Sequence, residues 1–124
     1  DQPPPADEAQ VFEQQDLLER LDGDRELADS AIAIFLEGAD EGVQELKAAI
    51  ASGNSTSVHL SAHGMKGAAL SCGAGRTAAV VRRLEFLAKD GSLVGAAQLL
   101  DELQQEIKLF KQELQKLGWR GDVG

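Results

Sequence analysis

The C-terminal quarter of the chain carries the pattern that most constrains its fold. Between residues 93 and 117, apolar residues recur at alternating steps of three and four: Leu93, Ala96, Leu100, Leu103, Ile107, Phe110, Leu114 and Leu117. In a helix this spacing places all of them on one face, and such a face must pack against other helices. The pattern therefore predicts a helix that belongs to a larger helical assembly.

Three earlier stretches show the same helical periodicity, separated by turn-forming residues. They predict a helix over about 25–51, a helix that begins at 55 or 56 and runs to 72, and a helix that contains residues 78–88, with breaks at 52–55, 73–75 and 90–91. A short amphipathic helix over 11–21 precedes them and ends at Asp22-Gly23-Asp24, where glycine ends one helix and aspartate caps the next. The expected inward-facing residues are Ala28, Ile32, Phe35, Ala39, Val43, Leu46, Ile50, Val58, Ala62, Met65, Ala69, Cys72, Ala78, Val81, Leu84 and Ala88.

Short connections force consecutive helices to lie antiparallel. We therefore expect an all-α fold, an antiparallel up-down four-helix bundle with a short extra N-terminal helix. Residues 1–10, which are proline-rich and acidic, are expected to form a flexible linker or domain boundary. The bundle then spans 11–118, and 119–124 form a frayed tail in which Trp119 covers an open end of the bundle.

Composition limits the classes of partner. The chain has 124 residues, enough for one domain, and its net charge of −9 repels nucleic acid and anionic membranes. No apolar run approaches the roughly 20 residues that span a bilayer, and no signal peptide opens the sequence, so we expect a cytoplasmic location. Cys72 is the sole cysteine and is expected to be a small buried hydrophobe.

His63 lies one position off the apolar stripe of its helix, which places its imidazole in water. Lys66 and Gly67 share its side of the helix. The ammonium suits the oxygens of a phosphoryl group, and the glycine leaves the approach open. Gly64 and Gly67 each cost the helix roughly 1 kcal/mol relative to alanine, which suggests a docking surface. Two alternatives remain open. The glycines could instead allow a neighbouring helix to pack closely, and the exposed histidine could have no function.

The segment Ala62-His63-Gly64-Met65-Lys66-Gly67, followed by small residues up to Gly73-Ala74, resembles the histidine-containing phosphotransfer (HPt) domains of bacterial multistep phosphorelays. The likeness covers roughly residues 12–115, including Leu-Asp-Gly-Asp-Arg-Glu-Leu, Ile-Phe-Leu-Glu and Arg-Leu-Glu. Gly64 stands where Ser or Thr is common, and Ala68 where Ser is frequent. These departures leave open whether a hydroxyl bonds to the phosphoryl group.

The resemblance implies that His63 takes a phosphoryl group from a receiver-domain aspartyl phosphate and passes it to another receiver aspartate. Glu85 would hold the proton on Nδ1, and Arg82 could add a second cation. The domain would be a phosphocarrier with no cofactor, metal or nucleotide site of its own, and Mg²⁺ is expected on the receiver. Leu60, Gly64 and Leu70 are the expected docking residues.

Two other interpretations are left open. The chain could be the phosphorylated domain of a chemotaxis-type histidine kinase, which receives phosphate from its own kinase domain, or a non-catalytic helical adaptor or dimerisation bundle. Its origin is equally open between a standalone protein and the C-terminal domain of a membrane-bound hybrid sensor kinase.

Overall fold

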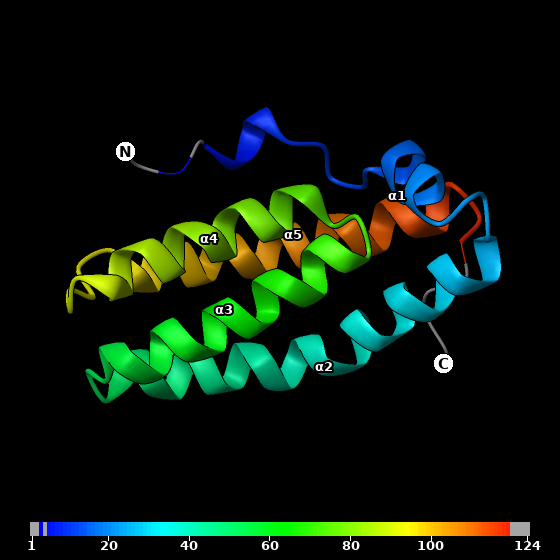
Figure 1. The fold of residues 1–124 in the computed structure, drawn as a ribbon. Helices are drawn as coiled ribbons and strands as arrows, with labels where there is room; N and C mark the ends of the chain where they lie inside the picture. The colour runs from blue at the N-terminus through cyan, green and yellow to red at the C-terminus, as the bar shows by residue number, and fades with distance from the viewer. Residues whose placement is uncertain (1–2, 4, 120–124) are drawn as a thin grey trace.

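The computed structural model describes residue 3 and residues 5–119, and all regular structure in this part is helical (Figure 1). Helices α2 to α5 run alternately in opposite directions; α3 packs on α2 and α4, and α5 packs on α2 and α4. The predicted antiparallel four-helix bundle with a short extra helix is confirmed. The elements are η1 (Ala6–Glu8, a 3-10 turn), α1 (Gln14–Arg20), α2 (Arg25–Ala51), α3 (Ser55–Ser71), α4 (Gly75–Lys89) and α5 (Ala96–Lys116).

Side-chain caps fix the starts of α2 and α3. The Asp24 carboxylate accepts a hydrogen bond from the backbone N–H of Leu27 at 3.0 Å, so α2 begins at Arg25. The Asn54 side chain accepts from the N–H of Ser57 at 3.1 Å, so α3 begins at Ser55. Both starts agree with those predicted from the turn residues.

Three predicted helix starts need correction. The first helix begins at Gln14, not Val11, and the fourth begins at Gly75, which was expected to belong to the break before it. The last helix begins at Ala96 because Gly95 adopts a left-handed conformation, with φ of +86°, which interrupts helical geometry after Leu93. Leu93 still packs partly against the core, as does Ile50, whereas Leu117 lies exposed beyond the end of α5.

The core joins distant parts of the chain through three phenylalanines. The Phe110 ring on α5 meets Phe35 on α2 and Phe12 before α1 edge-on, with centroid distances of 5.9 and 5.5 Å. Cys72 is fully buried, and this burial raises the pKa of its thiol to about 12. Within the described residues, no helix is both long and apolar enough to cross a membrane.

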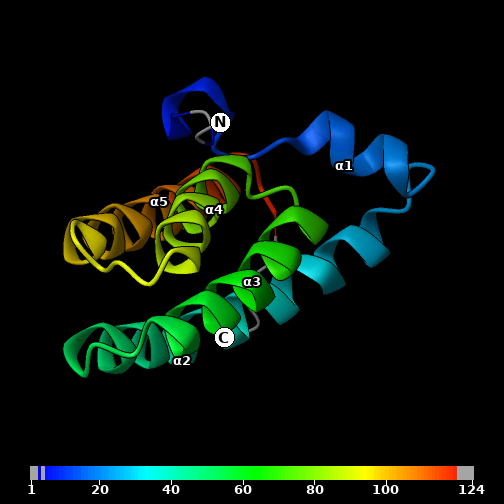
Figure 2. The same cartoon turned by 60° about the vertical axis from the view of Figure 1, so that its left-hand side comes forward.

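The segment before α1 is packed on the bundle, where the sequence predicts a solvated linker. Figure 2 shows it on the α4 side of the molecule, with α3 between α2 and α4. The Gln10 carbonyl accepts from the N–H of Arg76 at 2.9 Å and so caps α4, which has no side-chain cap. A Cβ at Gly75 would lie 2.6 Å from that carbonyl oxygen, so the contact requires glycine. Residues 1, 2 and 4 lie outside the described residues.

Trp119 closes the end of the bundle next to α1. Its indole Nε1 donates to the Gln14 side-chain oxygen at 2.5 Å, and its ring meets Phe12 edge-on at 5.3 Å. The Arg25 guanidinium lies 3.9 Å from the ring centroid, a cation–π contact. Trp119 is thus buried at this end of the bundle, where the sequence predicts that it covers an open end. Residues 120–124, the rest of the tail predicted to fray, lie outside the described residues.

Candidate functional site

The centre of the candidate site is His63, near the middle of α3. Its neighbours Ala62 and Met65 are buried on the inner face of the helix, and this places the His63 ring outside. The His63 side chain is 67% exposed. The structure therefore presents an imidazole that another protein can reach.

A single carboxylate from α4 holds two side chains of α3. His63 Nδ1 donates to Glu85 Oε2 at 2.5 Å, and Lys66 Nζ donates to Glu85 Oε1 at 2.6 Å. The Glu85 side chain is only 13% exposed, and it reaches this position because α4 packs antiparallel against α3. Three of the residues predicted for the site, His63, Lys66 and Glu85, thus form one cluster.

The protonation of Glu85 decides how the imidazole is oriented. Burial acts to raise the pKa of Glu85, but the hydrogen bonds and positive charges of Lys66 and His63 outweigh it, so the pKa lies below its ordinary value. At neutral pH the carboxylate is therefore ionised and can only accept hydrogen bonds. Nδ1 must carry the proton in this contact, and the neutral ring then has its lone pair on Nε2. Among the described residues, nothing hydrogen-bonds to Nε2.

The glycines beside His63 leave open surface. A Cβ at Gly64 or Gly67 would meet no atom within 4 Å, so neither glycine is needed for a neighbouring helix of this chain to approach. The helix-weakening cost of two interior glycines is therefore not offset by close packing inside the domain. Both positions leave the surface beside His63 open to solvent.

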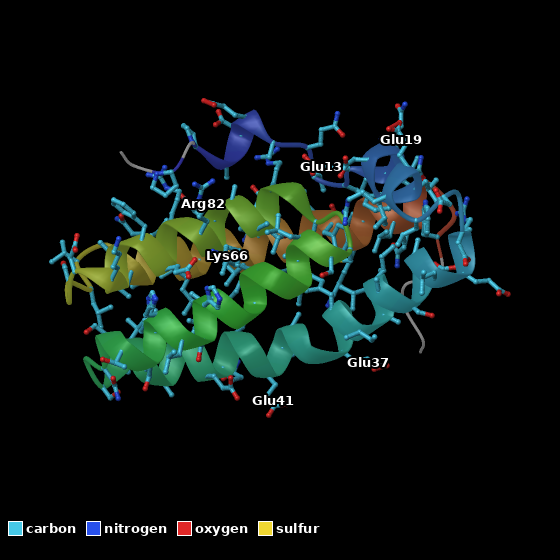
Figure 3. The ribbon with its side chains drawn as sticks, in the orientation of Figure 1. Glu13, Glu19, Glu37, Glu41, Lys66 and Arg82 are labelled. Carbon is cyan, nitrogen blue, oxygen red and sulfur yellow. The ribbon has the colours of Figure 1, made fainter. Side chains whose placement is uncertain are left out.

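Arg82 does not join the cluster. It is exposed on α4 and makes no ion pair or hydrogen bond within the part of the chain that the structure describes. Figure 3 shows Lys66 between α3 and α4, whereas Arg82 lies on the edge of α4 that faces the N-terminal segment. A second cation near His63 is thus not supplied by Arg82 in this arrangement.

A groove of about 460 Å³ runs between α2 and α3 beside His63. Leu60 and Gly64, two of the predicted docking residues, line it together with Ile34 and Gly42. A Cβ at Gly42 would collide with the Met65 side chain, so this glycine allows Met65 to form part of the groove. Leu70, the third predicted docking residue, is exposed on α3 but does not line the groove.

Sequence reasoning missed the contribution of α2 to this groove. Ile34 is 68% exposed, as exposed as Leu60, and both residues line the groove. The available signal was its position between the inward-facing residues Ile32 and Phe35, which points a branched apolar side chain to water. Leu27, also on α2, is exposed as well. Ile34 and Leu60 form an exposed apolar surface beside the histidine.

His59, one turn before His63, belongs to no metal-binding set that can be recognised. Its Nδ1 is buried and has no hydrogen-bond partner among the described residues. No group of three or more histidine, cysteine, aspartate or glutamate side chains suited to a metal ion occurs within residues 3 and 5–119. His59 therefore serves as a natural internal comparison for His63.

Comparison with known proteins agrees with this geometry. The sequence profile of the Hpt domain family matches residues 30–113, and the chain belongs to that family. The solved structure of histidine-containing phosphotransfer protein B (HptB) from Pseudomonas aeruginosa PAO1 is similar to this chain, with a TM-score of 0.75 and 26% sequence identity. The match covers 87% of this chain and 97% of HptB. A search of curated proteins finds no match.

Proposed function

We propose that the protein is a phosphorelay intermediate in which His63 accepts a phosphoryl group from a receiver-domain aspartyl phosphate and passes it to the aspartate of another receiver. The observation that carries the proposal is the Glu85 contact to Nδ1, which leaves the exposed Nε2 as the nucleophilic atom. Membership of the Hpt family supports the class of reaction.

The chemistry requires few groups from this domain. The Nε2 lone pair attacks phosphorus, the bond from phosphorus to the aspartyl oxygen breaks, and the receiver carboxylate leaves with the electron pair. The phosphorylated ring retains the proton on Nδ1, where the Glu85 carboxylate balances its positive charge. Lys66, one turn from His63 and bound to the same carboxylate, would compensate charge on the phosphoryl oxygens. The Mg²⁺ that such a transfer uses is expected in the receiver.

The groove between α2 and α3 is the proposed receiver-docking surface. It lies beside His63, and Ile34 and Leu60 offer it exposed apolar side chains that a partner can cover. Gly64 keeps the space next to the imidazole free. A receiver seated there would bring its aspartate to Nε2 without moving any helix of the bundle.

The proposal is tested with purified receivers charged by acetyl phosphate. After incubation with a charged cognate receiver, intact-mass measurement should show one added phosphoryl group that acid removes, because phosphohistidine is acid-labile. A second receiver that carries no phosphoryl group should then accept the group from His63. A phosphate that survives acid would overturn the proposal in favour of serine or threonine modification. Labelling only by a chemotaxis-type kinase domain with ATP would support that alternative instead.

Replacement of Glu85 by glutamine is expected to slow uptake of the phosphoryl group without abolishing it. A glutamine amide can donate as well as accept, so it no longer selects the ring form with the proton on Nδ1. Mutation of carboxylates that orient histidines at metal sites lowers activity by roughly tenfold to a hundredfold, and we expect a similar decrease in the rate of uptake here. Long-range ¹H–¹⁵N correlation spectra should show the His63 proton shifting toward Nε2 in the variant.

The same variant has a defined pH dependence. Because the pKa of Glu85 is lowered in the folded state, its contribution to stability is complete above the unfolded-state value and is lost as pH falls through the folded-state value. The stability difference between wild type and Glu85→Gln should therefore shrink below about pH 4. If Glu85→Gln leaves both the His63 tautomer and the uptake rate unchanged, Glu85 does not position the imidazole.

A further inference from the structure

Lys66 is placed unlike an ordinary surface lysine. Its side chain is 25% exposed, whereas the His63 side chain one turn earlier is 67% exposed. Lysine side chains usually remain in solvent, because fixing one in place costs conformational entropy. Figure 3 shows Lys66 between α3 and α4, where its Nζ donates to Glu85 Oε1 at 2.6 Å. The ammonium group is therefore held against the domain by one carboxylate oxygen.

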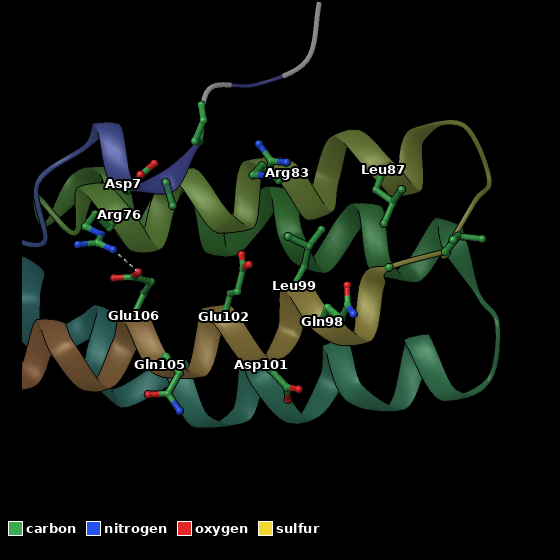
Figure 4. Close-up of a pocket in the computed structure, with 14 residues that line it drawn as sticks. Asp7, Arg76, Arg83, Leu87, Gln98, Leu99, Asp101, Glu102, Gln105 and Glu106 are labelled. Carbon is green, nitrogen blue, oxygen red and sulfur yellow. Dashed lines mark ion pairs between the residues drawn. The ribbon is translucent and has the colours of Figure 1, made fainter.

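The Glu85 carboxylate is held from two sides. Its Oε1 accepts from Lys66 Nζ, and its Oε2 accepts from His63 Nδ1. The ion pair between α4 and α5 is different, because Glu106 Oε2 accepts from Arg76 at 3.0 Å while Glu106 Oε1 has no donor among the described residues (Figure 4). Engagement of both oxygens is thus a feature of Glu85 and not of every ion pair on α4.

The contact with Lys66 determines how the carboxylate is oriented. The terminal torsion of a glutamate side chain has a broad distribution, so a single hydrogen bond leaves the carboxylate free to turn. With Oε1 fixed by Lys66, the other oxygen faces His63 Nδ1. Burial acts to raise the pKa of Glu85, and the Lys66 hydrogen bond is the largest influence that lowers it. The same contact therefore helps to keep the carboxylate ionised.

We propose that Lys66 is a positioning residue for His63 that acts through Glu85. It anchors the carboxylate so that Oε2 keeps the ring proton on Nδ1 and leaves the lone pair on Nε2 before any receiver is bound. An ammonium group has three N–H donors, so this role is compatible with later contact to phosphoryl oxygens. The consequence for transfer rests on the proposed function, whereas the orientation of the ring is a property of the free protein.

The test is the tautomer of His63 in the unphosphorylated protein, measured without any receiver. Long-range ¹H–¹⁵N correlation spectra are recorded at about pH 8, where an ordinary histidine is neutral. In Lys66→Met the ratio of the Nδ1–H form to the Nε2–H form should fall by about fivefold or more. Far-UV circular dichroism should show this variant folded, since methionine is a good helix former.

Lys47→Met is the matched control. Lys47 is exposed on α2 and forms no ion pair within the described part of the chain, so this variant makes the same change of charge outside the cluster. It should give the wild-type ratio of the two ring forms. The proposal is overturned if Lys66→Met gives that ratio as well.

A double-mutant cycle separates action through Glu85 from an independent effect of Lys66. Glu85→Ala removes the carboxylate, so adding Lys66→Met to it should leave the ratio at its Glu85→Ala value. Full addition of the two effects in the double variant would overturn the proposal. A protein whose ring responds as expected but which takes up no phosphoryl group would support this role of Lys66 and overturn only the proposed function.

Discussion

His63→Gln is expected to abolish uptake of the phosphoryl group completely. Glutamine is polar and uncharged, but its amide nitrogen has no available lone pair with which to attack phosphorus. Because the His63 side chain is 67% exposed, the free energy of unfolding should change by about 0.5 kcal/mol or less. Intact-mass measurement after incubation with a charged receiver should show the unmodified mass alone.

His59→Gln is the control for this variant. His59 lies one turn earlier on α3, so the same substitution on the same helix leaves the proposed nucleophile in place. It should take up one acid-labile phosphoryl group, as wild type does. If His63→Gln were labelled and His59→Gln were not, the acceptor would be His59 and the proposed site would be wrong.

Phe110→Ala is expected to cause the largest loss of stability. Phe110 is fully buried and meets Phe12 and Phe35 edge-on, so truncation leaves a cavity where three parts of the chain join. Large-to-small changes of this kind cost about 3–5 kcal/mol, against a total stability of about 5–15 kcal/mol for a domain. Urea unfolding followed by circular dichroism measures the difference.

The neighbouring residue provides the matched comparison. Leu109 is 38% exposed on the same turn of α5, and Leu109→Ala should cost about 0.5 kcal/mol, since alanine is also a good helix former. A similar loss for both variants would show that weakening of the α5 helix, and not the aromatic cluster, determines stability. A loss below about 1 kcal/mol for Phe110→Ala would contradict the packing described here.

The helices could be predicted where their signals are local. Asp24 and Asn54 are recognisable caps, and the apolar stripes of α2 to α5 contain residues that are almost all buried. The exposure of His63 also followed from its place beside the stripe. Each of these features depends on residues within a few positions of one another, so sequence spacing is enough to define it.

The remaining features depend on contacts between distant residues. The cap on α4 is the Gln10 backbone carbonyl, which has no side-chain signature, so residues 1–10 were expected to form a solvated linker. The Glu85 contact joins residues 22 positions apart, and it was expected only from the antiparallel packing of two helices together with the family resemblance. The role of Ile34 in the groove requires knowing which face of α2 lies beside α3.

The burial of Trp119 also makes the protein its own optical reporter. The chain has one tryptophan and no tyrosine, so its long-wavelength ultraviolet fluorescence arises from a single indole. That indole contacts Phe12, Gln14 and Arg25, far along the chain from itself and outside the groove beside His63. Its emission therefore registers when Trp119 packs against residues 12–25, while far-UV dichroism registers the helices. Coincidence of the two melting curves would mean that this packing and bundle formation are a single cooperative event.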